Sequence, residues 1–253
     1  MNATAQNHLG SLLQNLKLPG VRKSYQEMAD LARKESMSHE EYLWAVLEQE
    51  QTIRYQNRTT RFLKESRLPL EKTLDAFERK RLPARVNMQL SALLDGSFLK
   101  RAENLLVFGN PGSGKTHLVC ALGHQLVCDG HRILFKTTHS LVQELLAAKR
   151  DLKLPRFLKQ LGKYEALILD DIGYIQQDQK EMEVLFTLLA DRYERKSIVI
   201  TSNLPFSGWE KIFKDPMTTA AAIDRLVHHS IILELNLPSY RLEESKNGKQ
   251  SHK

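Results

Sequence analysis

The chain alternates between short apolar runs and longer segments whose apolar residues recur at helical spacing. Apolar runs of the length of buried strands lie at residues 104–108, 132–136, 166–169, 197–201 and 231–235. Helical spacing occupies residues 116–128, 140–148, 181–194 and 216–228. This alternation predicts an α/β protein in which helices connect the strands of a parallel sheet.

The region before the first strand has a helical pattern only. Four leucines between residues 9 and 16 share one helix face, and Pro19 suits the first position of a second helix. Ser38 followed by Glu41 is the signature of a capping box. It predicts a third helix from about residue 39 to residue 65, a stretch without glycine or proline.

Pro69 ends this helical region, because proline cannot continue a helix. We therefore predict a small all-α N-terminal domain over residues 1–68 and an α/β core over residues 69–242. Residues 243–253 are polar and are predicted to form a disordered tail.

A glycine-rich stretch directly follows the first apolar run of the core. It consists of Gly109, Asn110, Pro111, Gly112, Ser113, Gly114, Lys115 and Thr116. The stretch matches the P-loop pattern G-x-x-x-x-G-K-[ST] and lies between a predicted strand and a predicted helix. Backbone N–H groups and the helix N-terminus bind phosphates in such loops, the lysine reaches the β- and γ-phosphates, and the hydroxyl ligates Mg²⁺. A chance match in a loop is the alternative, and the flanking strand and helix argue against it.

The apolar run at residues 166–169 ends in Asp170 and Asp171, which is the pattern of a Walker B strand. Asp170 is expected to hold Mg²⁺ through water opposite Thr116, and Asp171 to orient or deprotonate the attacking water. A strand that merely ends in a turn is the alternative. Asn203 ends the next predicted strand and is expected to help hold the same water, although turn chemistry would also explain it.

The distribution of charge points to an anionic partner, nucleic acid first and an acidic membrane surface second. The chain has 37 Lys and Arg against 30 Asp and Glu, a formal net charge of +7. Basic residues recur along one face of the third N-terminal helix and again in a segment near residues 149–159, which we expect to be a projecting loop. The predicted contacts to DNA phosphates are Arg54, Arg58, Arg61, Lys149, Arg150 and Lys153. A solvated surface is the alternative for each cluster.

Cysteine content and hydropathy bear on the cellular location. Cys120 and Cys128 form no metal-binding pattern and suit a reduced protein. No apolar run approaches the ~18 residues of a membrane span, and the N-terminus lacks the apolar core of a signal peptide. We therefore predict a cytoplasmic protein without a membrane partner.

Taken together, the motifs resemble AAA+ ATPases of the helicase-loader clade. More narrowly, they resemble the IstB-like helper ATPases that insertion sequences encode beside their transposase. The resemblance rests on the P-loop and on LDDIGY at 169–174, RYER at 192–195, TSNLPF at 201–206, AIDRL at 222–226 and SYR at 239–241. It covers nearly the whole chain, including the N-terminal helices.

The resemblance implies a three-layer AAA+ core that binds ATP and Mg²⁺ and hydrolyses ATP slowly, stimulated by DNA or a partner. It further implies a homo-oligomer with ATP at its subunit interfaces, assembly on duplex DNA without sequence preference, and recruitment of a cognate transposase for target selection. The N-terminal domain would then serve DNA binding or oligomerisation. No separate C-terminal lid is expected, because only a short tail follows Leu235.

The resemblance also implies roles for single residues. Asn203 corresponds to sensor 1 and Arg225 to the arginine finger that completes a neighbour's site, with Arg192 as a second candidate. Asp171 stands where many AAA+ proteins have glutamate. In P-loop proteins with an added N-terminal region the adenine often lies against the connector, so Leu74 and Phe77 are expected near it, with plain core packing as the alternative.

Two other functions compete with the transposition helper. A DnaC-like helicase loader shares the ATPase core but usually carries a different N-terminal region, and the long basic helix fits duplex tracking better. A metabolic P-loop kinase is a third interpretation. The basic clusters and the lack of a visible acceptor-substrate site argue against the kinase.

Overall fold

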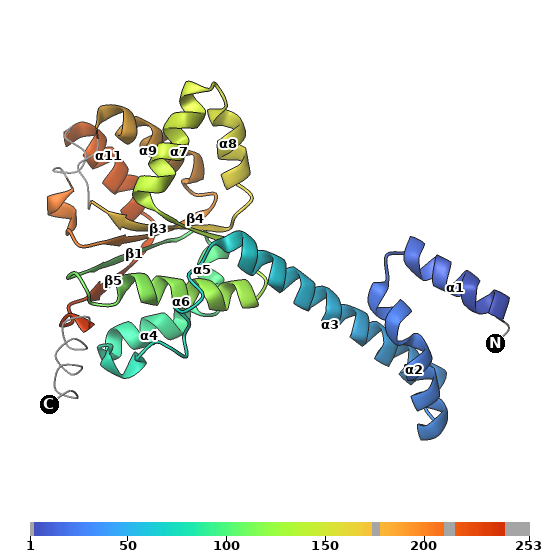
Figure 1. Cartoon of the computed structure of the whole chain (residues 1–253). Helices are drawn as coiled ribbons and strands as arrows, with labels where there is room; N and C mark the ends of the chain where they lie inside the picture. The colour runs from blue at the N-terminus through green and yellow to red at the C-terminus, as the bar shows by residue number, and fades with distance from the viewer. Residues whose placement is uncertain (1–2, 174–177, 210–215, 241–253) are drawn as a thin grey trace, which may run out of the picture. The chain divides into compact units, whose positions relative to one another are not determined.

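The computed structural model in Figure 1 describes residues 3–173, 178–209 and 216–240. The chain forms two compact units, Met1–Arg61 and Phe62–Lys253. The predicted division into domains at residue 68 stays a prediction. The predicted tail at residues 243–253 and Arg241 of the SYR stretch lie outside the described residues.

The N-terminal helices are those that the sequence predicts. They are α1 (Ala3–Asn15), α2 (Pro19–Glu35) and α3 (His39–Ser66). Pro19 opens α2, and the capping box of α3 is present. Glu41 N–H donates to Ser38 Oγ at 3.2 Å, and Ser38 N–H donates to Oε2 of Glu41 at 2.7 Å. Leu13, Val21 and Val46 form the small apolar core of these helices.

A buried carboxylate ties α2 to α3. Oε2 of Glu50 accepts hydrogen bonds from the backbone N–H groups of Gly20 at 2.6 Å and Val21 at 3.0 Å. Oε1 accepts from Nε of Arg54 at 2.6 Å. Gly20 permits this approach, because a Cβ at that position would lie 2.9 Å from the Cα of Glu50. The first N–H groups of α2, which have no partner inside the helix, are thereby capped from α3.

The second unit is built on a five-stranded parallel sheet in the order β2-β3-β4-β1-β5. The strands are β1 (Asn104–Gly109), β2 (Ile133–Thr137), β3 (Ala166–Ile172), β4 (Ser197–Ser202) and β5 (Ser230–Leu235). All five coincide with the predicted apolar runs, so the predicted α/β class with a parallel sheet is confirmed. Strand β4 lies between β1 and β3, although it follows both in the sequence.

Helices cover both faces of the sheet and make three layers (Figure 1). Helices α4 (Ala84–Leu93), α5 (Ser97–Lys100) and α6 (Lys115–Cys128) lie on one face. Helices α7 (Thr138–Arg150), α8 (Leu154–Leu161), α9 (Gln179–Arg192) and α11 (Pro216–Val227) lie on the other. The strands supply alternate residues to the two layers: Leu105 and Val107 pack with the first group and Leu106 with the second. Two short 3₁₀ turns, η1 (Arg79–Arg81) and η2 (Phe206–Gly208), complete the described elements.

The prediction of a projecting loop near residues 149–159 is wrong. The segment contains the end of α7, a short turn and helix α8. The α8 side chains Leu154, Phe157, Leu158 and Leu161 recur at helical spacing and pack into the core on the α7 and α9 side of the sheet. The lysines and arginines between these side chains dominate the sequence of the segment and obscure the helical spacing of its apolar residues. The turn itself exposes Leu152, which has a left-handed φ of 57°.

Candidate nucleotide-binding site

The candidate site lies where β1, β3 and β4 end. The P-loop begins at Gly109, the last residue of β1, and Asp170 and Asp171 directly precede Ile172, the last residue of β3. Thr201 is the residue before the end of β4, and Asn203 directly follows that strand. Parallel sheets bind ligands at the carboxyl ends of their strands, next to the point where the chain connects to a distant strand. Because β4 separates β1 from β3, the end of β4 lies between the P-loop and the acidic pair.

Two glycines of the P-loop make close approaches that a side chain would block. Gly109 has a φ of 157°, and a Cβ there would collide with the carbonyl oxygen of Leu235. Gly112 has a φ of 79°, and a Cβ there would collide with the side chain of Ser239. Within the described part of the chain, the buried Oγ of Ser113 has no hydrogen-bond partner. A loop with close backbone approaches and an unsatisfied hydroxyl fits a phosphate cradle.

The ammonium group of Lys115 is held against the inside of the P-loop. Its Nζ donates to the carbonyl oxygens of Gly109 at 2.8 Å and Asn110 at 3.0 Å. The side chain is buried, with 6 % of its residue surface exposed. A buried cation whose position is fixed by carbonyl groups is prepared to bind an anion at low reorganisation cost.

Thr116, Asp170 and Thr201 form a connected polar cluster across three elements. Oδ1 of Asp170 accepts hydrogen bonds from Oγ1 of Thr116 at 2.9 Å and from Oγ1 of Thr201 at 2.6 Å. The hydroxyl of Thr138 donates to the Asp170 carbonyl oxygen at 3.0 Å. The Asp170 carboxylate therefore faces the Thr116 hydroxyl, as a shared position on Mg²⁺ requires.

Asp171 and Asn203 lie beside this cluster and are exposed to the pocket. Asp171 has a left-handed φ of 58°, and its N–H donates to Oγ1 of Thr201 at 2.8 Å. The Thr201 hydroxyl thus accepts from Asp171 and donates to Asp170. One hydroxyl therefore contacts both the backbone of Asp171, whose side chain is exposed, and the buried carboxylate of Asp170.

A cavity of about 390 Å³ opens in front of the P-loop. Residues of the P-loop from Pro111 to Thr116, Asp171 and Asn203 contribute to its lining. The connector before α4 and the segment after β5 contribute Phe77, Arg81, Leu82, Leu237 and Tyr240. This volume and mixture of apolar, aromatic and charged groups suit a nucleotide.

The Tyr240 backbone is attached to the P-loop itself. Its N–H donates to the carbonyl oxygen of Gly112 at 3.0 Å. The guanidinium carbon of Arg81 lies 5.1 Å from the centre of the Tyr240 ring. Phe77 makes an edge contact with the His117 ring, at 5.1 Å between ring centres. These contacts place two aromatic side chains, one from each end of the core, at one cavity.

Of the two connector residues predicted near the adenine, Phe77 lines the cavity and Leu74 does not. The lining therefore favours Phe77 as the adenine contact, and the expectation for Leu74 stays a prediction. The connector turns back on itself here, since Phe77 N–H donates to the Leu74 carbonyl oxygen at 3.2 Å. Leu74 is half-buried within that turn.

Arg192 is not placed to serve a neighbouring subunit, and this second candidate for the arginine finger is corrected. Only 1 % of the residue is exposed. Its guanidinium donates to four carbonyl oxygens, those of Leu161, Tyr164, Glu165 and Ser197, at 2.9–3.3 Å. Burial lowers the pKa of Arg192 to about 10, so it stays charged at neutral pH. It is a structural residue between β3, β4 and α8.

Arg225, the first candidate for the arginine finger, lies half-buried on α11. Its guanidinium carbon is 4.4 Å from the centre of the Phe186 ring of α9. Nη1 is covered and has no hydrogen-bond partner within the described part of the chain. Stacking on a ring holds a guanidinium in place without neutralising its charge.

The predicted DNA contacts differ in how far they are committed within the chain. In the N-terminal unit, the Arg54 side chain binds Glu50 and donates to the Lys17 carbonyl oxygen at 2.6 Å. Arg58 is exposed and lies 5.7 Å from the centre of the Tyr55 ring, and Arg61 is also exposed.

The remaining predicted contacts belong to the second unit, where Lys149 and Arg150 end α7 and Lys153 lies in the turn before α8. Lys149 forms an ion pair with Glu183 at 2.6 Å. Arg150 approaches Asp151 at 3.4 Å with most of its side chain exposed, and Lys153 is exposed. Arg58, Arg150 and Lys153 therefore present more accessible charge than Arg54 or Lys149.

Sequence reasoning missed Thr201, Arg81 and Leu237 as site residues, and assigned Tyr240 no role. A hydroxyl one residue before the end of a β-branched strand looks like any strand residue. The proximity of Tyr240 to the P-loop depends on β5 lying beside β1, for which the local sequence has no signal.

A P-loop at the end of β1, an acidic pair in the last residues of β3 and the polar end of β4 between them define a nucleotide-binding protein of the AAA+ class. The chain belongs to the family described as IstB-like ATP binding protein, which it matches over residues 11–248. The predicted resemblance is thereby confirmed.

Relatives and a solved structure agree with this assignment. An insertion-sequence ATP-binding protein of Sinorhizobium fredii is 41% identical over 250 residues, which are 98% of this chain and 84% of that protein. The ATP-binding protein of the insertion sequence IS21 from Pseudomonas aeruginosa is 38% identical over 96% of this chain and 91% of that protein. The DnaC helicase loader has the same fold, with a TM-score of 0.56 and 19% identity over 65% of this chain and 97% of that chain.

Hydropathy along the helices gives one further result. Among the described residues, every helix is too short or too polar to cross a membrane.

Proposed function

We propose that this protein is an ATP-hydrolysing helper of insertion-sequence transposition that assembles on duplex DNA and recruits its cognate transposase. The observation that carries the ATPase part is the Asp170 carboxylate, which accepts hydrogen bonds from the hydroxyls of Thr116 and Thr201 beside the P-loop. The transposition part is supported by relatives that are insertion-sequence ATP-binding proteins. We also propose a cytoplasmic location and no membrane partner.

The residues of the site divide the work of hydrolysis. P-loop N–H groups and Lys115 bind the phosphates, and Phe77 and Tyr240 bind the adenine ring. Thr116 and Asp170 fit Mg²⁺, which would neutralise charge on the β- and γ-phosphates. Asp171 orients or deprotonates the attacking water, and Asn203 holds that water as sensor 1. Because the aspartate arm is shorter than the usual glutamate, we propose slow turnover that DNA or a partner stimulates.

Arg225 is proposed to complete the site of a neighbouring subunit in a homo-oligomer. Its charge would then leave the Phe186 ring and stabilise the γ-phosphoryl oxygens of the neighbour's ATP. Mixing two inactive variants tests this role. Arg225→Ala keeps the P-loop and Lys115→Ala keeps Arg225, so a mixture should regain part of the hydrolysis rate. No regain would mean that Arg225 acts within its own subunit or only packs on Phe186.

DNA binding is proposed to rest on the basic side chains of both units. We assign it to Arg54, Arg58, Arg61, Lys149, Arg150 and Lys153, with residues 1–68 as a domain for DNA binding or oligomerisation. Contacts of arginine and lysine to phosphates read no bases, so binding should be independent of sequence and should weaken steeply with salt. A DnaC-like helicase loader is the second candidate, because this chain shares the fold of the DnaC helicase loader.

The deciding experiment compares assembly on long duplex DNA and on single-stranded DNA, with ATP, with ADP and with Lys115→Ala. Cooperative ATP-dependent particles on duplex, seen by electron microscopy and lost in the variant, are the expected result. A preference for single strands without assembly on duplex would favour the helicase loader.

Charge reversal locates the DNA contacts. Arg58→Glu combined with Lys153→Glu should abolish duplex binding at moderate salt while nucleotide affinity stays unchanged. Arg33→Glu is the matched control, because Arg33 is an exposed helix arginine already paired with Asp30 at 2.7 Å. Unchanged duplex affinity in the double variant would refute the assignment.

A further inference from the structure

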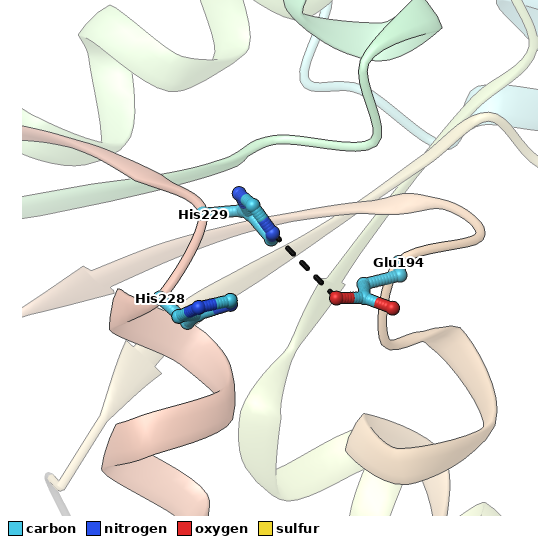
Figure 2. Close-up of side chains that lie close together, drawn as sticks. All are labelled: Glu194, His228 and His229. Carbon is cyan, nitrogen blue, oxygen red and sulfur yellow. Dashed lines mark ion pairs between the residues drawn. The ribbon is translucent and has the colours of Figure 1, made fainter.

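A cluster of candidate metal ligands lies where β4 and β5 begin. The P-loop lies at the other end of the strands, where β1 ends. Glu194 lies in the turn between α9 and β4, and His228 and His229 lie between α11 and β5 (Figure 2). One nitrogen of each imidazole and one oxygen of the carboxylate all lie within 4.8 Å of one another. The nucleotide site uses none of these three side chains.

The spacing of two ligand atoms already fits a metal ion. Oε1 of Glu194 and Nε2 of His229 are 3.6 Å apart, the pair that Figure 2 marks with a dashed line. A tetrahedral Zn²⁺ with bonds of ~2.0–2.2 Å holds neighbouring ligand atoms roughly 3.3–3.6 Å apart. The two rings adjoin each other as well, with 4.3 Å between the ring centres of His228 and His229.

A buried asparagine holds together the two segments that carry the ligands. The N–H of Asn104 donates to the His229 carbonyl oxygen at 2.7 Å. Its side-chain Oδ1 accepts from the N–H of Ile198 at 2.9 Å, and its Nδ2 donates to the Leu226 carbonyl oxygen at 3.2 Å. The first residue of β1 thus fixes the start of β4 and the end of α11 relative to each other.

The Glu194 turn and the His228 ring are fixed by separate contacts. Buried Arg192 accepts at its carbonyl oxygen from the N–H groups of Arg195 and Lys196, both at 3.0 Å, which closes the turn. Glu194 itself has a left-handed φ of 56°. The Tyr193 hydroxyl lies 3.0 Å from Nδ1 of His228 and orients that ring. Such support of ligands by neighbouring hydrogen bonds is typical of metal sites.

The ligand types select among cations. Two imidazoles and one carboxylate suit Zn²⁺ and similar transition metals, whereas Mg²⁺ prefers oxygen ligands and several waters. The side chains of His229 and Glu194 are 49% and 55% exposed, so an ion can enter from solvent. We propose that Glu194, His228 and His229 bind one Zn²⁺, with water as the fourth ligand. The bound ion clamps the starts of β4 and β5, the two strands that flank β1.

Titration of the tag-free, nucleotide-free chain with ZnCl₂ in the presence of excess MgCl₂ tests the proposal. Calorimetry should give one Zn²⁺ per chain, and the melting temperature should rise with Zn²⁺. His228→Ala, His229→Ala and Glu194→Gln should each lower Zn²⁺ affinity by about 10-fold or more. Loss of a residue that only hydrogen-bonds a metal ligand already costs about 10-fold, and these three residues are the proposed ligands. ATP affinity should stay unchanged in all three, because the P-loop lies at the opposite end of the strands.

Three further variants separate this site from other sources of Zn²⁺ binding. His8→Ala removes an exposed imidazole of the N-terminal unit, and Cys128→Ser removes the exposed thiol; both should bind Zn²⁺ as the parent does. Tyr193→Phe keeps the ring but loses the hydroxyl contact to His228. It should weaken Zn²⁺ binding while leaving the melting temperature without Zn²⁺ unchanged.

Three results would overturn the proposal. They are no Zn²⁺ binding by the parent chain, affinity retained in a His228→Ala, His229→Ala double variant, and loss of binding in Cys128→Ser. Glu194→Gln conserves size at an exposed position, so it gives a folded variant if the histidine variants do not fold.

Discussion

Thr201 donates a hydrogen bond of 2.6 Å to Oδ1 of Asp170, from the strand next to the one that carries Asp170. The same hydroxyl accepts from the N–H of Asp171 at 2.8 Å. One side chain of β4 therefore orients the proposed metal-linked carboxylate and the backbone of the proposed water-activating residue. Thr201 is a positioning residue, since it does not line the cavity in front of the P-loop.

Thr201→Val should lower the hydrolysis rate by at least 10-fold and the free energy of unfolding by about 1–3 kcal/mol. The methyl group keeps the shape but leaves the partly buried N–H of Asp171 and the buried carboxylate of Asp170 each short of one hydrogen bond. Urea unfolding and the steady-state ATPase rate measure the two effects. Thr187→Val is the control, because the Thr187 hydroxyl donates only to the carbonyl oxygen of Glu183 within its own helix. An unchanged rate in Thr201→Val would show that Asp170 and Asp171 need no such support.

Tyr240→Ala should raise the dissociation constant for ATP by about 10-fold. Stacking of a base on an aromatic ring contributes about 1–3 kcal/mol. Among the described residues that line the cavity, Tyr240 is the one tyrosine. Binding of a fluorescent ATP analogue measures the change. Tyr55→Ala removes an exposed tyrosine of the N-terminal unit and should leave ATP affinity as it is. Equal affinities of the two variants would place the adenine away from Tyr240.

Arg192→Met should lower the free energy of unfolding by about 3–5 kcal/mol, because it leaves the four carbonyl oxygens that the guanidinium binds without that donor. Urea unfolding followed by circular dichroism measures this loss. Arg195→Met, at an exposed position of the following turn, should change stability by no more than about 0.5 kcal/mol. If Arg192→Met stayed as stable as the parent and lost only ATP hydrolysis, Arg192 would again be a candidate for the arginine finger in a neighbour's site.

Glu50 should make the N-terminal unit sensitive to acid. Burial opposes its ionisation, but hydrogen bonds from Arg54, Val21 and Gly20 outweigh burial and hold the pKa of Glu50 below its usual value of 4.5. A carboxyl group with a lowered pKa in the folded state stabilises fully above its unfolded pKa. That contribution is lost as the pH falls through the folded pKa.

Glu50→Gln should therefore lower the stability of the N-terminal unit near neutral pH by about 1–3 kcal/mol and reduce its loss on acidification. Hydrogen exchange of α2 and α3 at about pH 7 and about pH 4, corrected for intrinsic rates, measures both effects. Glu48→Gln is the control, because Glu48 is exposed on the same helix. Equal pH dependence in the two variants would contradict a role for Glu50.

The chain's local sequence determined much of the fold and of the phosphate-binding part of the site. Strand and helix positions follow from apolar spacing, and the P-loop follows from eight consecutive residues between a strand and a helix. The capping box at Ser38 and Glu41 is likewise local and is present in the structure. Each of these signals lies within one turn or one strand, so no knowledge of strand order is needed to find it.

Tertiary structure alone decided which polar residues meet. Arg192 and Arg225 look alike in the sequence, yet Arg192 is buried against carbonyl groups of distant segments, whereas Arg225 lies on the Phe186 ring. Thr201 reaches Asp170 because β4 is inserted between β1 and β3, and Tyr240 reaches the P-loop because β5 lies beside β1. Hydrogen bonds between strands depend on the order in which strands pair, and apolar periodicity specifies which face of a strand is buried but not its neighbour.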